Sequence, residues 1–158
     1  MDDLKVRIVH LDPMRVASAT GYGESPEPLA WDKLAAWAGP KGLLGRLDQH
    51  RIFGFHNPNP SPGSPEYGYE FWITVGPDMG AEGDVEIKEV PGGVFAVTSC
   101  EPRIGEDITA TWQQLAQWLM NSEHQPAHEQ WLEEHIWPSG GPFDFGTLRL
   151  DLFAPIAE

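Results

Sequence analysis

The sequence predicts an α+β fold made of two tandem strand–helix–strand–strand units with pseudo-twofold symmetry, in which antiparallel sheets carry helices on one face and enclose a central cleft. Two observations predict it. A strand pattern recurs after 79 residues and an amphipathic helix pattern recurs after 81 residues, in the same order along the chain. We interpret this as an internal duplication, with pseudo-repeats at about residues 4–80 and 83–157 of a single domain that spans residues 1–158.

The strand pattern opens each repeat. Residues Val6–Leu11 alternate apolar and polar side chains, stop at Pro13 and continue as a second apolar strand. Residues Val85–Val90 do the same before Pro91. Alternation that ends at a Pro or Gly is typical of two strands joined by a short turn.

The helix pattern is a Trp, a Leu and a second Trp at positions i, i+3 and i+6, which share one broad face of a helix. It occurs at Trp31, Leu34 and Trp37 and again at Trp112, Leu115 and Trp118. We expect the four tryptophans to anchor the two helices on the sheets. Pro28 and Asp107 mark the expected helix starts, and Gly39 and Asn121 mark the expected ends.

Further strands close each repeat. The first repeat has strand patterns at residues 50–57 and 67–75, and the second has one at residues 147–153. Ahead of that last strand the sequence predicts a short helix over Pro126–His135, with Pro126 in its first turn. Two such units leave a cleft where they meet, and clefts of this kind are frequent sites for small ligands.

Composition narrows the classes of function. The chain has a net charge of −14 and only ten basic residues, which are scattered, so the sequence argues against a nucleic-acid partner. An acidic protein attracts cations. The acids concentrate in residues 81–158, where 14 acids and 3 bases give −11, against −3 from 10 acids and 7 bases in residues 1–80. A solvated acidic surface that keeps the protein soluble explains the same charge.

The single cysteine and the first residues of the chain indicate the cellular compartment in which we expect the protein. Cys100 has no partner for an internal disulfide, which indicates a reducing compartment, and its apolar neighbours predict a buried strand position. The first residues lack the features of a signal peptide, and no stretch approaches the roughly 18 apolar residues of a membrane span. We expect a soluble, cytoplasmic protein with no membrane association.

The order of these elements and several short motifs resemble the GyrI-like small-molecule-binding domains, which serve AraC/Rob-type and MerR-type regulators as effector-binding domains. The motifs are Gly54-Phe-His-Asn-Pro58, Tyr69-Glu70, Ile87–Gly93 and Glu129-Gln-Trp131, and the resemblance covers about residues 4–156. It implies the same duplicated fold and a central ligand cleft. Because no helix-turn-helix precedes residue 4, we expect a standalone member that acts by ligand capture, by catalysis or through a protein partner.

Two carboxylates are candidates for the site. By this resemblance Glu129 points into the central cleft, where an acid among aromatic rings would attract a lipophilic cation; the alternative is an exposed acid on a surface helix. Strand alternation supplies the second candidate. Tyr69 and Phe71 fall on the face that packs on a helix, whereas Glu70 and Trp72 fall on the open face. An ordinary half-exposed strand shows the same mixture.

The other residues expected to line the site are aromatic. They are Tyr22, Trp72, Trp131, Trp137 and Phe143. Phe143 lies in a Gly/Pro-rich loop, which suits either a lid or burial against the sheet. His128-Glu129 begins like the zinc motif His-Glu-x-x-His, but the position of the second histidine holds Leu132, so we expect no metal and no cofactor.

Three functions follow as hypotheses. The first is a multidrug-type binder of small, lipophilic, cationic aromatic molecules. The second, implied by resemblance to some standalone family members, is a hydrolase of strained, cyclopropanoid electrophiles. In it Glu129 would be the general acid/base, and Tyr22 or Tyr69 would hydrogen-bond the developing charge. The third is an interaction protein that inhibits DNA gyrase. A protein partner or a homodimer stays open for each.

Overall fold

The protein forms two compact units. The computed structural model describes residues 4–45, 49–57, 61–101, 106–127, 130–137 and 148–157. The first unit comprises residues 14–90, and the second unit comprises residues 1–13 together with residues 91–158. Within the described ranges, no helix has both the length and the apolar character needed to cross a membrane.

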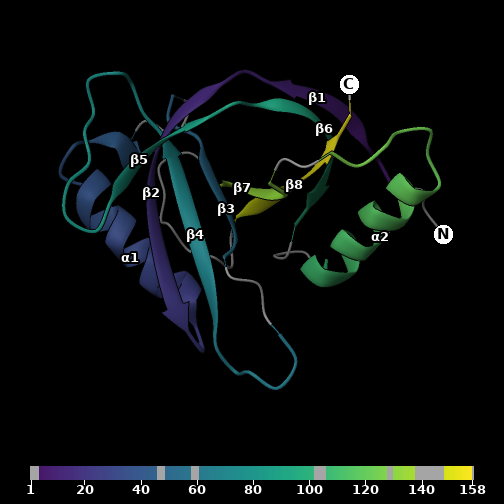
Figure 1. The fold of residues 1–158 in the computed structure, drawn as a ribbon, viewed down its shortest axis with the longest axis horizontal. Coiled ribbons are helices and arrows are strands. Elements are labelled where there is room, and N and C mark those ends of the chain that lie inside the picture. The colour runs from purple at the N-terminus through teal and green to yellow at the C-terminus, as the bar shows by residue number, and fades with distance from the viewer. Residues whose placement is uncertain are drawn as a thin grey trace. The chain divides into compact units, whose positions relative to one another are not determined.

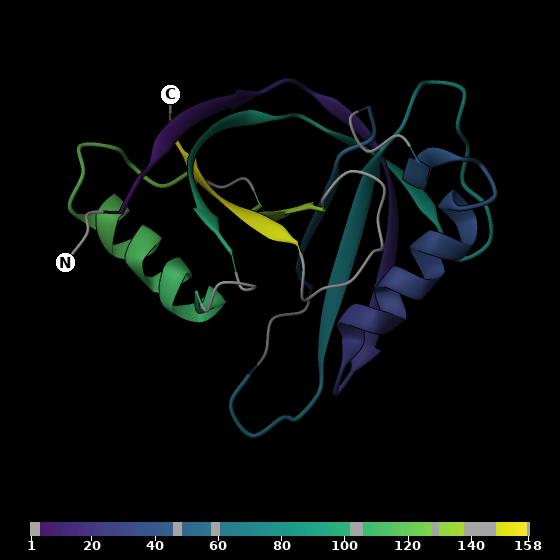
Figure 2. The same ribbon diagram turned by 180° about the vertical axis from the view of Figure 1, so that it is seen from behind.

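The first unit is a four-stranded antiparallel sheet with one long helix. Its elements are β2 (Met14–Gly23), α1 (Pro26–Ala38), the short 3₁₀ turn η1 (Leu43–Gly45), β3 (Ile52–His56), β4 (Tyr67–Thr74) and β5 (Glu86–Val90). The strand order is β3-β4-β2-β5. Helix α1 lies along the β2 and β4 strands, which Figure 2 shows from the helix side.

The second unit also consists of a four-stranded antiparallel arrangement and one long helix. Its elements are β1 (Arg7–Leu11), β6 (Gly93–Cys100), α2 (Ile108–Met120), β7 (Leu132–Ile136) and β8 (Arg149–Ile156). The strand order is β7-β8-β6-β1, again antiparallel, and α2 packs on β6 and β8 (Figure 1). The predicted α+β class, with antiparallel strands and a helix on one face of each sheet, is therefore confirmed.

The units differ from the predicted repeats in their opening strands. β1 pairs with β6, from Arg7 opposite Val97 to Leu11 opposite Gly93, whereas β5 pairs with β2. β1 thus pairs with a strand of the second predicted repeat, and β5 pairs with a strand of the first. Gly92 in the turn before β6 has a φ of 77°, and a Cβ there would collide with the carbonyl oxygen of Leu11. Glycine therefore lets β1 approach this turn closely.

Helix α1 is anchored as its sequence pattern predicts. Its buried side chains are Pro26, Ala30, Trp31, Leu34, Trp37 and Ala38. The Trp31 ring meets the Phe71 ring edge-on at 5.4 Å, so the helix is fixed to β4 by an aromatic pair. Full burial of a side chain such as Leu34 contributes about 2 kcal/mol to folding.

Helix α2 buries less of its surface. Thr111, Leu115 and Leu119 are buried, whereas both tryptophans are half-buried. The Trp112 indole donates a hydrogen bond to Glu133 at 2.9 Å, and Trp118 stacks on a neighbouring histidine ring. The predicted anchoring role thus describes the tryptophans of α1 better than those of α2.

The segment Pro126–His135 was predicted as a short helix, and that prediction is wrong. Residues 132–136 form strand β7, whose partner β8 places Leu132 opposite Phe153 and His135 opposite Leu150. Pro126 forms an isolated bridge to Ile156. Pairing with β8 satisfies the backbone groups that a helix would have satisfied internally, so tertiary contact overrides the local pattern.

Candidate functional site

The sheet of the first unit has two distinct faces. The helix face carries Tyr69 and Phe71, and Gly21 lies so close to α1 that a Cβ there would collide with the Pro26 carbonyl. The opposite face carries Glu70 and Trp72, as strand alternation predicts. This second face was expected to be open, but it is buried: Glu70 is 1% exposed and the rings around it are also buried.

Glu70 accepts four hydrogen bonds. Its Oε2 atom receives the Ser18 hydroxyl at 2.7 Å, the Trp72 indole N–H at 2.6 Å and the Lys88 ammonium at 2.7 Å. Its Oε1 atom receives the Asn57 amide at 2.9 Å. These five residues form what we call the Glu70 cluster. Its members come from β2, β4, β5 and the end of β3, so four segments of the chain converge on one carboxylate.

These donors keep the carboxylate charged. Burial alone would raise the pKa of Glu70, because an ion is poorly solvated there. The hydrogen bonds from Lys88, Ser18, Asn57 and Trp72 outweigh burial and hold this pKa below its usual value. Glu70 is therefore an ionised acid at neutral pH, almost wholly removed from water.

Aromatic rings surround this acid on the same sheet face. Phe53 lies opposite Trp72 and Phe55 lies opposite Glu70 in the β3–β4 pairing. The Phe55 and Trp72 rings meet edge-on, with centroids 4.8 Å apart. The cluster thus combines a buried negative charge with flat apolar surfaces, the combination that recognises aromatic cations.

The cluster reaches solvent through its polar members. The Lys88 side chain is 39% exposed, and Asn57 is exposed. Tyr22 lies on the same face of β2 as Ser18, opposite Gly68 of β4, and is 56% exposed. Lys88 and Asn57 are therefore the members of the cluster that link the buried carboxylate to the protein surface.

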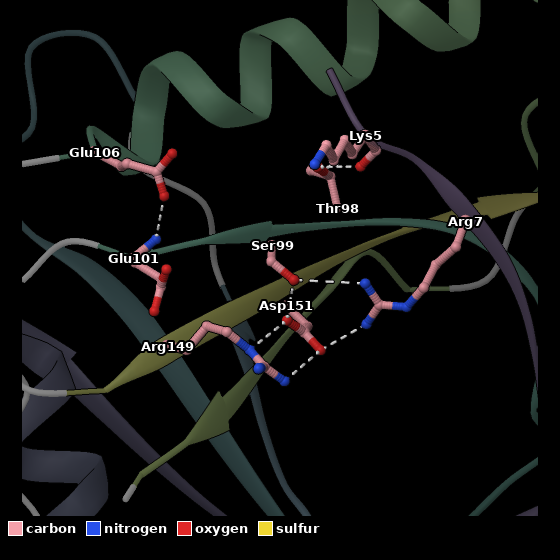
Figure 3. A network of polar contacts seen from close by, with 8 residues as sticks. All are labelled: Lys5, Arg7, Thr98, Ser99, Glu101, Glu106, Arg149 and Asp151. Carbon is pink, nitrogen blue, oxygen red and sulfur yellow. Dashed lines mark hydrogen bonds and ion pairs between the residues drawn. The ribbon is translucent and has the colours of Figure 1, made fainter. Parts of the chain in front are cut away.

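The second unit holds a comparable cluster around Asp151 (Figure 3). Asp151 is buried, and its Oδ1 atom accepts the Ser99 hydroxyl at 2.7 Å and Arg149 Nε at 3.1 Å. Its Oδ2 atom pairs with an Arg7 guanidinium nitrogen at 2.8 Å. We call these four residues the Asp151 cluster. The arginine side chains are 51% and 45% exposed for Arg7 and Arg149.

Glu70 and Asp151 stand at equivalent positions. Glu70 lies opposite Thr20 in the β4–β2 pairing, and Asp151 lies opposite Ser99 in the β8–β6 pairing. Both face away from the helix of their own unit. The sequence reasoning missed Asp151, although the 81-residue spacing of the repeated helices also separates Glu70 from Asp151.

The remaining predicted site residues have separate positions. Trp131 is half-buried beside Trp112, with ring centroids 5.7 Å apart, and Trp137 is buried near the His135 ring at 5.8 Å. The structure brings neither of them to the Glu70 cluster in any contact that it describes. Tyr69 lies on the helix face, away from Glu70. Glu129 and Phe143 lie outside the described residues.

Clusters of metal-ligating side chains were also sought in the described part of the chain. Among those residues, no group of three or more His, Cys, Asp or Glu side chains is arranged to hold a metal ion. The motif His128-Glu129 lies outside them.

Solved structures share this fold at low sequence identity. The C-terminal domain of EcmrR superposes with a TM-score of 0.70 at 13% identity, over 98% of both chains. In the complex of EcmrR with DNA, the TM-score is 0.68 at 14% identity. The match covers 96% of this chain and 57% of the EcmrR chain. This protein thus spans little more than half the length of EcmrR.

Two further structures show the same likeness. A hydrolase from Listeria innocua matches with a TM-score of 0.66 at 11% identity, over 99% of this chain and 94% of that one. SAV2435, in its complex with tetraphenylphosphonium, matches with a TM-score of 0.53 at 9% identity, over 98% of this chain and 94% of that one. At these identities the likeness establishes the fold alone.

Comparison with protein-family models identifies the family of the sequence, whereas the solved structures establish only its fold. No curated protein matches it. The model of the integron-associated effector binding proteins matches residues 7–156, nearly the whole chain. The predicted GyrI-like fold and a general capacity to bind small molecules agree with this match. The chain belongs to the family of integron-associated effector binding proteins.

Proposed function

We propose that this protein binds small lipophilic cations at the Glu70 cluster. The observation that carries the proposal is a single carboxylate that is 1% exposed, ionised and bordered by the Trp72 and Phe55 rings. A carboxylate in such surroundings attracts positive charge more strongly than one in water, because little solvent screens it. Ring faces add a further attraction for a cation and accept large flat groups.

The charge of the whole protein favours the same ligands. A net charge of −14 raises the local concentration of cations around the molecule and repels anions. Stacking and charge attraction impose little shape selection, so we expect the site to take a range of aromatic cations rather than one. The tetraphenylphosphonium complex of SAV2435, a protein of the same fold, supplies a suitable probe.

The test is titration with two ions of the same shape and opposite charge. Tetraphenylphosphonium should quench tryptophan fluorescence with a saturable, micromolar curve, whereas tetraphenylborate should bind at least about tenfold more weakly. Calorimetry should give the same two affinities. Equal affinities, or no saturation by either ion, would contradict the proposal.

A variant pair assigns the binding to Glu70. Glu70→Gln preserves the size of the side chain but removes its charge, so tetraphenylphosphonium should bind about tenfold more weakly. Glu86 provides the control, because it is an exposed acid on β5 opposite Ser18. Glu86→Gln removes the same charge nearby and should change affinity less than about twofold. Similar losses in both variants would mean that overall charge, not Glu70, attracts the ligand.

The other functional hypotheses stay predictions. The hydrolase mechanism paired Glu129 with Tyr22 or Tyr69. Glu129 lies outside the described residues, and Tyr69 is on the opposite sheet face from Glu70. No contact of the described residues favours gyrase inhibition, a protein partner or a homodimer, and the cytoplasmic location also stays a prediction.

A further inference from the structure

Lys88 pairs with the same carboxylate that, under the proposed function, attracts the positive charge of a ligand. We propose that Lys88 is a resident counter-cation of Glu70, which a bound cation replaces, and that Lys88 thereby sets the affinity of the site and its discrimination of charge. This inference rests on the proposed function. It adds that the ligand cation and Lys88 compete for the same carboxylate group of Glu70.

The geometry of the pair suits such an exchange. Lys88 Nζ lies 2.7 Å from Oε2 of a carboxylate that is 1% exposed, while the Lys88 side chain is 39% exposed. The lysine therefore enters the cluster from the solvent side on a flexible stem. Rotation about the bonds of this stem can return the ammonium to water, so the backbone does not have to move.

The other donors remain when Lys88 leaves. Ser18 and Trp72 are buried, and with Asn57 they still give Glu70 three hydrogen bonds from neutral groups. These bonds keep the carboxylate in place, but they supply no net positive charge. Departure of Lys88 thus leaves an oriented, uncompensated anion that a ligand cation can pair with.

The Asp151 cluster shows why only one of the two acids can exchange its partner. Asp151 is shared by Arg7 and Arg149, and the Ser99 hydroxyl bonds both Asp151 and Arg7. Guanidinium groups hold carboxylates through several donors in a fixed plane, and two would have to leave together. Glu70 has a single point charge to lose. The Glu70 cluster is therefore the exchangeable one.

Affinity should reveal the competition. Lys88→Met keeps the length and apolar stem of the side chain but removes its charge, so a cation no longer has to displace an ion pair. Tetraphenylphosphonium should then bind about tenfold more tightly than to the wild-type protein, and tetraphenylborate should bind more weakly. Lys41→Met is the matched control, because Lys41 also pairs with an acid, Glu82, at 3.1 Å. It should change both affinities less than about twofold.

A second measurement needs no substitution. The chain has four lysines, and protein labelled with ¹³C-lysine should give four resolved Cε signals. Saturation with tetraphenylphosphonium should move the Lys88 signal toward that of a free lysine side chain while those of Lys33 and Lys41 stay in place. This readout holds even if Lys88→Met fails to fold.

The outcomes separate the two proposals. If the wild-type protein binds tetraphenylphosphonium but Lys88→Met binds no tighter, or the Lys88 signal does not move at saturation, the exchange is refuted and the binding function stands. If neither protein binds the cation, the binding function fails and the exchange falls with it. Tighter binding by Lys88→Met than by the wild-type protein, together with a shift of the Lys88 signal in the wild-type protein, supports the exchange.

Discussion

Glu70 on β4 and Asp151 on β8 are equivalent acids of the two units, each buried on the sheet face away from its helix. Each accepts a serine hydroxyl at 2.7 Å from the neighbouring strand, from Ser18 in one unit and Ser99 in the other. Their cations differ: one flexible lysine balances Glu70, whereas two arginines surround Asp151. We therefore expect the same position to serve exchange of a cation in the first unit and a structural role in the second.

The first prediction separates these two roles. Glu70→Gln and Asp151→Asn should each lower the free energy of unfolding by about 2 kcal/mol, because each leaves cations without their acid. The loss stays below that of a fully buried pair, since Lys88, Arg7 and Arg149 can rehydrate. Urea unfolding at pH 7 measures it.

Binding then distinguishes the two variants. Only Glu70→Gln should weaken tetraphenylphosphonium binding, while Asp151→Asn should retain the wild-type affinity within about twofold. Asp12→Asn is the stability control, because the Asp12 side chain is 94% exposed. It should change the free energy of unfolding by less than about 0.5 kcal/mol. An equal loss of affinity in Asp151→Asn would show that the units do not divide the roles in this way.

The second prediction concerns the starts of the two helices. Asp107 caps α2, since its Oδ1 atom accepts the Ala110 backbone N–H at 2.7 Å, whereas Ser25 makes no such bond at the start of α1. Asp107→Ala should cost about 1 kcal/mol of stability and Ser25→Ala less than about 0.5 kcal/mol. Thermal unfolding of both variants checks this difference, and equal losses would show that the side-chain bond contributes nothing.

The sequence predicted those features that depend on local pattern. Asp107 carries the chemistry of a helix start, and Trp31 and Leu34 fall on the face of α1 that the structure buries. Glu70 and Trp72 share a sheet face because alternation along an extended chain leaves no other arrangement. Cys100 is buried in β6, also as its apolar neighbours predict.

The features that sequence missed depend on which strands pair. Residues 132–136 contain two acids and a histidine and do not look like a strand, yet β8 makes them one. Alternation also could not tell that Glu70 is buried, because burial depends on what covers the face. Asp151 escaped notice for the same reason: its two arginine partners come from β1 and β8, and Arg7 is 144 residues away in sequence.

The third prediction tests why β3 contains a glycine at position 54. A Cβ at Gly54 would lie 2.5 Å from the Tyr69 hydroxyl oxygen and 2.8 Å from Cζ of the same ring. Gly54→Ala should therefore cost about 2–3 kcal/mol, because Tyr69 is buried and its ring must move. Gly45→Ala should be nearly neutral, since nothing lies within 4 Å of its added Cβ.

A double variant identifies the colliding group. Tyr69→Leu removes the ring, so Gly54→Ala should cost at least about 1 kcal/mol less in that background than in the wild-type protein. Chemical denaturation of the four proteins in the cycle gives this coupling. Strict additivity would mean that strain in the β3 backbone, rather than contact with Tyr69, accounts for the loss.

The fourth prediction concerns acid stability and depends on His135. Burial lowers the pKa of this histidine to about 4 from an ordinary value of 6.5, although the Glu133 charge and backbone carbonyl favour the protonated form. The folded protein therefore prefers neutral His135, whereas the unfolded chain takes up a proton below about pH 6.5. Stability from this residue is complete above pH 6.5 and is lost as the pH falls toward 4.

The loss of folding stability caused by protonation of His135 can be separated from the loss caused by protonation of Glu70, because the two occur in different pH ranges. A His135 pKa of 6.5 in the unfolded chain and of about 4 in the folded protein corresponds to about 3 kcal/mol of folding stability. The free energy of unfolding should therefore change with a slope of about 1.4 kcal/mol per pH unit between pH 6 and 5. The lowered pKa of Glu70 contributes stability that is lost only as the pH falls below its usual value of 4.5. Urea unfolding of the wild-type protein at several pH values from 7 to 5 should therefore report His135. His135→Gln should flatten this slope, whereas His10→Gln, at a side chain that is 63% exposed, should leave it unchanged. A slope that persists in His135→Gln would place the responsible proton on another group.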